Sequence, residues 1–121
     1  MYGHNISSMV CKVSASAQKP IKSGLNTFAV SSESISDATE MYGLYRSGVG
    51  GTLRIYQGMG TPTGAAWILV EEITVTAVGG TFNTDGNGAE IEPIRIAGES
   101  VKIEFQASGN SNDFQLLLMR R

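Results

Sequence analysis

The chain is poor in the side chains from which catalytic and metal sites are usually built. Its 121 residues include one cysteine, Cys11, and one histidine, His4. A single cysteine excludes a disulfide within the chain, and without paired cysteines or a second histidine there is no zinc-type ligand set. A Ser-His-Asp arrangement would depend on His4 alone, which lies in a terminal segment. We therefore expect no catalytic residues, no metal site and no cofactor, and a protein that is not an enzyme.

Charge and long apolar runs are scarce as well. Charged residues make up 17% of the chain, and the net charge is -2. Such a balance creates no long-range field that would gather nucleic acid or an anionic membrane. No apolar run approaches the roughly 18 residues of a membrane-spanning helix, and the N-terminus has no signal-peptide pattern. We expect no nucleic-acid or membrane partner, and assembly in a reducing cytoplasm, which a lone cysteine fits.

Glycine-rich turns and short alternating segments make up most of what is present. Apolar and polar side chains alternate with a period of two, which places one set on a buried sheet face and the other in solvent. The expected strands cover residues 6–15, 26–31, 40–46, 52–57, 67–78, 91–96, 101–107 and 112–121. About eight short strands at hairpin spacing, without a convincing helix, predict an all-β, antiparallel β-sandwich or jelly roll.

Two of the strands carry irregularities. Glu71 and Glu72 interrupt the alternation of 67–78, which indicates a β-bulge or a bend that would let one strand serve two sheets. Because adjacent side chains in a strand point to opposite faces, these two carboxylates cannot act as an acid–base pair. Pro93 predicts that 91–96 is an edge strand or begins a strand, since proline has no N–H for the ladder.

The last strand is apolar on both faces. Phe114, Leu116 and Leu118 share one face, and Leu117 and Met119 share the other. An antiparallel strand normally has one face in water. This strand is therefore either central in a covered sheet or lies against another chain. The residues expected in the core are Val101, Ile103, Phe105, Phe114 and Leu116.

The two ends of the chain are locally cationic, and at the C-terminal end the charges are those of Arg120 and Arg121. Lys12, Lys19 and Lys22 precede the first acidic residue, Glu33. These charges either keep the chain ends soluble or belong to a basic arm that grips an acidic partner protein. We divide the chain into an N-terminal arm with a possible first strand, residues 1–22, and a single β-sandwich domain, residues 23–121.

Two glycine- or acid-containing segments resemble ligand loops only in part. Residues 48–51 lack the Gly-Lys-Ser/Thr ending of a phosphate cradle and read as a turn. Asp85, Asn87 and Glu90 have the oxygen ligands of a calcium loop but not its full set of acids. A plain hairpin turn at 83–90 is the favoured interpretation, with a cation site as the alternative.

The aromatic side chains offer a further alternative. Trp67, Tyr42, Tyr45 and Tyr56 could stack on a sugar, or they could be packing residues of the sandwich. A carbohydrate-binding sandwich is therefore a hypothesis beside the structural one.

Residues 51–118 resemble a β-sandwich pattern found in structural proteins of tailed-phage virions. The resemblance lies in the order of the parts, which are GTLRIYQ, AAWILVEEITVTA, a glycine pair, IEPIRI, VKIEF, the turn SGNSND and FQLLLM. The segment GMGTPTGAA departs from the pattern, in which relatives carry a short acidic turn before the tryptophan. The resemblance carries over no catalytic residues.

The resemblance implies a component of the virion, assembled in the host cytoplasm. It would be a capsid decoration or cement protein, or alternatively a tail or fibre part, and such proteins commonly form symmetric trimers. Its partners would be further copies of itself and the major capsid protein or neighbouring virion subunits. We expect self-association through Leu117, Met119, Arg120 and Arg121, and partner binding by the arm through Lys12, Lys19 and Lys22.

Overall fold

The computed structural model describes residues 7–29, 35, 37–77 and 88–121. Every regular element in this part of the chain is a β-strand, so the prediction of an all-β fold is confirmed. No helix long and apolar enough to cross a membrane occurs among these residues. The strands are β1 (Ser8–Ser14), β2 (Gly24–Ala29), β3 (Glu40–Ser47), β4 (Gly51–Met59), β5 (Ala66–Val75), β6 (Ala89–Arg95), β7 (Ser100–Ala107) and β8 (Phe114–Arg120).

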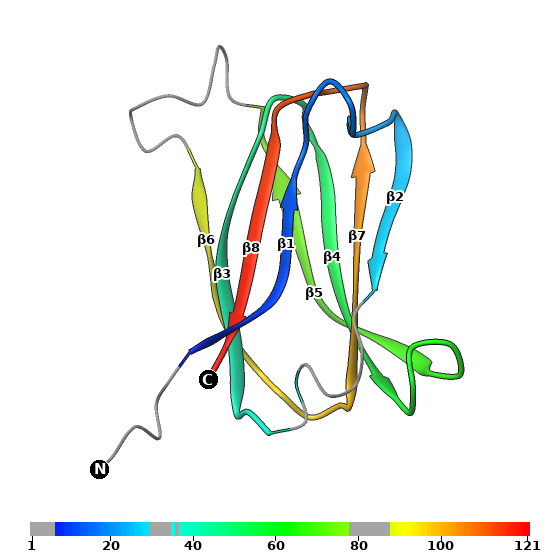
Figure 1. Ribbon diagram of the computed structural model, residues 1–121, viewed down its shortest axis with the longest axis vertical. Coiled ribbons are helices and arrows are strands. Elements are labelled where there is room, and N and C mark those ends of the chain that lie inside the picture. Colours follow the sequence, from blue (N-terminus) through cyan, green and yellow to red (C-terminus); the bar gives the residue numbers. More distant parts are fainter. Residues whose placement is uncertain (1–6, 30–34, 36, 78–87) are drawn as a thin grey trace.

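The eight strands form two four-stranded sheets packed face to face (Figure 1). The β8 sheet has the order β1-β8-β3-β6, and the β7 sheet has the order β2-β7-β4-β5. Every neighbouring pair in both sheets is antiparallel. The predicted antiparallel sandwich is therefore present, with β1, β6, β2 and β5 as its four edge strands.

The pairing is nested in the manner of a jelly roll. β4 pairs with β5, β3 with β6, β2 with β7 and β1 with β8. This is the pairing of one long hairpin whose tip is the β4–β5 turn and whose two arms are then wrapped into two sheets. The further pairs β3–β8 and β4–β7 join the wrapped arms. The eight-stranded jelly roll avoids a single wide open sheet by this double-sheet arrangement.

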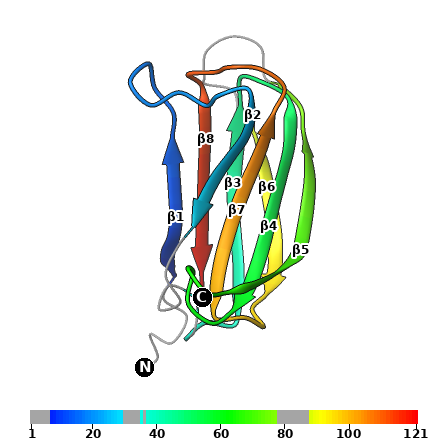
Figure 2. The ribbon, with the colours of Figure 1, turned by 90° about the vertical axis from the view of Figure 1, so that its right-hand side faces the viewer.

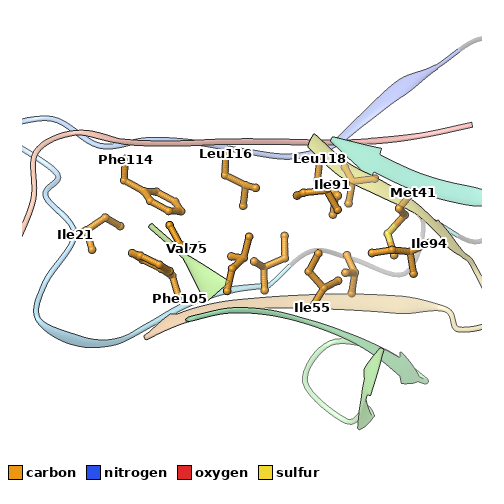
Figure 3. Packing of buried hydrophobic residues seen from close by; sticks show 14 of the residues in the cluster. Ile21, Met41, Ile55, Val75, Ile91, Ile94, Phe105, Phe114, Leu116 and Leu118 are labelled. Carbon is orange, nitrogen blue, oxygen red and sulfur yellow. The ribbon is translucent and has the colours of Figure 1, made fainter. Parts of the chain in front are cut away.

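The core lies between the two sheets and follows the alternation of the strands. Phe114, Leu116 and Leu118 point from β8 toward Phe105 and Ile55 of the other sheet (Figure 3). The rings of Phe105 and Phe114 stack across the core with centroids 4.6 Å apart. The five residues predicted to be core from the sequence are all buried: Val101, Ile103, Phe105, Phe114 and Leu116.

The irregularity predicted in β5 is present. The register between β4 and β5 shifts where Ile55 faces Glu71 and Tyr56 faces Leu69, so Val70 is the extra residue of a bulge. The bend does not carry the strand into a second sheet, because β5 pairs with β4 along its whole length. The predicted edge position of the strand containing Pro93 is also observed, since β6 pairs only with β3 in the described structure.

Residues 8–22 are part of the sandwich. β1 pairs with β8 along its length, with one register shift between Met9 and Cys11. Ile21 is buried and forms a bridge with Ser111. Residue 22 therefore marks no boundary between structural units in this region, and residues 1–6 of the predicted arm lie outside the described residues.

The buried side-chain amide of Gln57 links the two sheets by hydrogen bonds at one end of the sandwich. Gln57 of β4 is 4% exposed, and its Nε2 donates a hydrogen bond of 2.8 Å to the carbonyl oxygen of Arg95, the last residue of β6. Its Oε1 accepts hydrogen bonds from the backbone N–H groups of Ala97 and Gly98. Because both ends of the amide are satisfied, its burial costs little. Beyond this point the β4–β5 hairpin extends past the body of the sandwich (Figure 1).

Candidate interaction surfaces

The outer face of the β8 sheet carries a continuous row of side chains across all four strands. Lys12 faces Leu117, Leu117 faces Leu44, and Leu44 faces Glu90 in the strand register. A second row contains Met9, Met119 and Tyr42. The centre of this face is therefore apolar, and Lys12 and Glu90 mark its two edges. Leu117 and Met119, predicted as interface residues, lie together on this face.

This outer face is exposed and hollowed. Leu44 is 56% exposed and Met9 is 58% exposed, although both are large apolar side chains. Leu117 and Met119 are half-buried. A groove of about 640 Å³ crosses the face and is lined by residues from all four strands or their ends, including Lys12, Leu44, Glu90, Gln115 and Leu117. An exposed, concave apolar surface of this kind is typical of an interaction site.

The two C-terminal arginines make contacts within the chain at one end of this face. Arg121 forms a 2.9 Å ion pair with Glu40 and lies over the ring of Tyr42, 4.5 Å from its centroid. Arg120 Nε donates a hydrogen bond of 2.7 Å to Ser8 Oγ. Arg120 and Arg121 thus tie the end of β8 to β1 and β3, and they border the Met9–Met119–Tyr42 row.

The three N-terminal lysines do not gather at one point. Lys12 lies on β1, and Lys19 and Lys22 lie in the connection from β1 to β2. All three side chains are exposed. They line the side of the sandwich formed by the edge strands β1 and β2. Within the described chain none of the three forms an ion pair.

The centre of the outer face of the β7 sheet is polar and its charged groups contact one another, whereas the exposed Leu25 and Leu69 lie toward its two edges. Arg54 pairs with Glu72 at 2.8 Å, and Lys102 pairs with Glu104 at 3.6 Å. Tyr56 Oη donates a hydrogen bond of 2.8 Å to Glu104. This hydrogen bond to the carboxylate, together with some burial, raises the pKa of Tyr56. The charged and phenolic groups at the centre of this face therefore already have partners.

The aromatic side chains proposed for sugar stacking are divided among three places. Trp67 and Tyr56 share the outer face of the β7 sheet, where Lys102 Nζ lies 4.5 Å from the Tyr56 centroid and 5.3 Å from that of Trp67. The Trp67 ring also packs on Gly58, where an added Cβ would come within 2.8 Å of it. Tyr42 lies on the outer face of the other sheet and Tyr45 packs against the core. Only Trp67 and Tyr56 come together.

No group of three or more His, Cys, Asp or Glu side chains suited to a metal ion occurs in the part of the chain that the structure describes. His4, Asp85 and Asn87 lie outside the described residues, while Glu90 is exposed on β6. Cys11 is half-buried, and burial raises the pKa of its thiol. A raised pKa lowers the thiolate fraction and makes the thiol a poor nucleophile near neutral pH.

The strand β5 presents an apolar segment that the sequence interpretation did not single out. Ile68, Leu69 and Val70 are 55%, 45% and 40% exposed. Three consecutive apolar residues place apolar groups on both faces of the strand, and the bulge at Val70 adds to this. The run WILV lies at the start of the strand expected over residues 67–78, and the sequence alone does not show that this strand is at an edge. The structure places it at an open edge.

Comparison of the chain with protein-family models, with curated proteins and with solved structures found no match.

Proposed function

We propose that this protein is a structural component of a virion, most specifically a capsid decoration protein that binds and cross-links capsid subunits. The observation that carries the proposal is the exposed, grooved apolar face of the β8 sheet, with Leu44 and Leu117 at its centre. This face would pack on a neighbouring subunit of the particle. A tail or fibre component would use the same face, and it is the closest alternative.

Burial of this face supplies the free energy of binding. Apolar surface removed from water contributes roughly 25 cal/mol per Å², before the costs of association are subtracted. The two most exposed side chains of the face, Met9 and Leu44, gain most from being covered. Lys12 and Glu90 bound this apolar centre at its two edges. An apolar centre with a charged rim is the usual arrangement of a protein–protein interface.

The fold supports the proposal by analogy only. Jelly rolls occur in viral capsid proteins, in lectins and in cupins, so the fold alone does not select a function. The surface favours assembly, because Leu44 and Leu117 lie at the centre of the groove. The resemblance of residues 51–118 to virion proteins agrees with the same choice.

A carbohydrate-binding role is the second candidate, and it rests on Trp67 and Tyr56. These two rings share one face, as a sugar platform requires. However, Lys102 already lies over both rings, and Tyr56 Oη is engaged by Glu104. A sugar would have to displace these contacts. Titration of the Trp67 fluorescence with mono- and oligosaccharides tests this role, and a saturable change would support it.

The proposed function is tested by mixing the purified chain with empty capsids assembled from the major capsid protein of the same genome. We expect saturable binding at a fixed copy number per capsomer, measured by co-sedimentation. Leu44→Lys should abolish the binding, whereas Thr52→Lys on the other sheet should preserve it. Absence of saturable binding to capsids would refute the decoration role, and saturable binding to purified tails instead would establish the tail alternative.

A further inference from the structure

The four edge strands carry most of the exposed large apolar side chains of the described structure. Seven such side chains are exposed, and five of them lie on edge strands. Met9 is on β1, Leu25 is on β2, and Ile68, Leu69 and Val70 are on β5. An exposed apolar edge strand is a site for pairing with another chain unless charge, proline or a cover protects it. β5 contains no proline, and its apolar part, Trp67–Val70, contains no charge.

The two sides of the sandwich carry opposite charge. Figure 2 shows β1 at one side of the molecule and β5 at the other. The lysine edge, formed by β1, β2 and their connection, carries Lys12, Lys19 and Lys22 and no acidic residue. The glutamate edge, formed by β5 and β6, carries four glutamates and one arginine, a net charge of -3: Glu71, Glu72, Glu90, Glu92 and Arg95. The two edges are therefore complementary.

The strand directions allow the two edges to meet. Because every neighbouring pair is antiparallel, β6 runs opposite to β1 and β5 runs opposite to β2. If copies are related by rotation about an axis parallel to the strands, β6 of one copy meets β1 of the next in antiparallel orientation. β5 and β2 meet in the same way. Both sheets would then continue from copy to copy.

The register places opposite charges at the same height. Lys12 and Glu90 are the two ends of one row across the β8 sheet. A rotation about an axis parallel to the strands keeps that height, so Glu90 of one copy meets Lys12 of the next. In the β7 sheet the corresponding row ends at Thr27 and Glu72, where a hydroxyl can donate to a carboxylate. Neither of these rows brings like charges together.

From these observations we infer that copies of this chain assemble head to tail, the glutamate edge of one against the lysine edge of the next. This contact deepens the proposed function and rests on it, since a contact between copies would join the capsid subunits that each copy binds. β5 and β2 supply the backbone ladder, because Pro93 interrupts the N–H donors of β6. In this register Leu25 lies level with Thr74 of the neighbouring copy, and Leu69 lies level with Ala29.

The proposed contact would exchange two roles expected from the sequence. Leu117 and Met119 were expected to mediate self-association, and the lysines to bind a different partner. Leu117 and Met119 lie on a sheet face, which cannot be joined to a second copy by continuing a sheet. Lys12 lies at an edge, which can. We therefore assign the edge to contact between copies and the face to the capsid partner.

A charge-swap experiment tests the contact. The oligomeric state of the full chain is measured by sedimentation equilibrium across a dilution series for Lys12→Glu, Glu90→Lys and the double variant. We expect each single variant to weaken association about tenfold, because an attractive pair becomes repulsive, and the double variant to recover to within about twofold of the wild type. In a two-fold β5–β5 dimer, by contrast, Lys12→Glu would leave association unchanged.

Two further variants test the strand pairing. Leu69→Lys should block the β5 edge and leave a folded monomer, whereas Leu44→Lys, which changes a more exposed leucine on the outer face of the β8 sheet, should keep self-association. Gln106→Lys and Gln106→Glu, on an inner strand of the β7 sheet, control for added charge. Circular dichroism verifies that each variant is folded.

The outcomes separate this contact from the proposed function. A wild-type chain that stays monomeric, or single variants that associate as the wild type does, would overturn the head-to-tail contact. Such a chain could still saturate capsids, and the decoration role would then stand. A chain that shows the charge-swap rescue but does not bind capsids keeps the contact and loses the decoration role.

Discussion

The outer faces of the two sheets differ in the polarity of their centres. On the β7 sheet, Arg54, Tyr56 and Lys102 are held by carboxylates and rings of the same face. On the β8 sheet, the exposed Leu44 and the half-buried Leu117 line a groove of about 640 Å³. Both faces are built by the same alternation of strands around one core. The difference therefore lies in the outward residues alone.

This difference indicates which face is available to another protein. A partner that covered the β7 sheet would have to desolvate an existing network of ion pairs, and this costs free energy unless each group finds a new partner. A partner that covered the β8 sheet would remove apolar surface from water, which is favourable.

Removing the stacked rings of Phe105 and Phe114 should destabilise the whole sandwich, and with it both outer faces. Phe105 and Phe114 are fully buried and join the two sheets across the core. We expect Phe105→Ala to lower the free energy of unfolding by about 3–5 kcal/mol, because it leaves a cavity. Urea denaturation followed by circular dichroism measures this loss. A loss below about 1 kcal/mol would show that the stack does not hold the sheets together, and Phe105→Leu serves as the smaller control.

Removing apolar side chains from the outer face of the β8 sheet should weaken capsid binding while the chain still folds. Leu117→Ser combined with Met119→Ser deletes half-buried apolar groups from the β8 sheet. We expect a drop of at least about tenfold in capsid affinity, with about 1 kcal/mol lost in the free energy of unfolding. Thr52→Ser combined with Thr74→Ser makes a matched change on the β7 sheet and should affect neither. Unchanged capsid binding in the first variant would place the contact elsewhere.

Removing the ammonium group that lies over Tyr56 and Trp67 should expose these two rings on the outer face of the β7 sheet. Lys102→Met removes the ammonium group that lies over Tyr56 and Trp67. We expect a loss of about 0.5–1 kcal/mol in the free energy of unfolding and an increase in quenching of Trp67 fluorescence by acrylamide. Lys19→Met, an exposed lysine with no ring beneath it, is the control. If quenching is the same in both variants, Lys102 does not shield the tryptophan.

The polar network of the β7 sheet should also affect the titration of Tyr56 at high pH. The hydrogen bond to Glu104 raises the pKa of Tyr56 above its value in the unfolded chain. Its contribution to stability is therefore complete below about pH 10, the ordinary tyrosine value, and is lost as the pH rises through the higher folded value. Absorbance titration at alkaline pH should show a late step that Tyr56→Phe removes. Glu104→Gln should move that step to lower pH, and a step that stays in place would contradict the assigned cause.

The sequence predicted well which side chains point into the core and which point outward, because the alternation along a strand is a local property. Val101, Ile103 and Phe105 follow the period of two without interruption, and all three are buried. The two-faced apolar pattern of Phe114–Met119 likewise indicated an unusual strand, and β8 is central in its sheet. The bulge near Glu71 was also visible, since it broke the alternation.

Contacts between distant strands could not be predicted in this way. Gln57 continues the inward alternation of β4, but its hydrogen-bond partners lie at the end of β6 and in the connection that follows it. Lys12 and Glu90 become the ends of one row only through the register of three strand pairs. Strand order decides such neighbours, and no local pattern in one sequence encodes it. The same reason explains why Ile68, Leu69 and Val70 were not recognised as an exposed edge.

The nested pairing of the strands has a consequence for the rate and order of folding. β4 and β5 are joined by a short turn, whereas β1 and β8 are brought together from the two ends of the described chain. Closing a long loop costs more chain entropy than closing a short one, so pairing should spread outward from the β4–β5 hairpin. Substitutions in that hairpin should slow refolding, and those between β1 and β8 should mainly speed unfolding. Stopped-flow kinetics with the reverse pattern would contradict this order, in which the Lys12–Leu117–Leu44–Glu90 row is completed last.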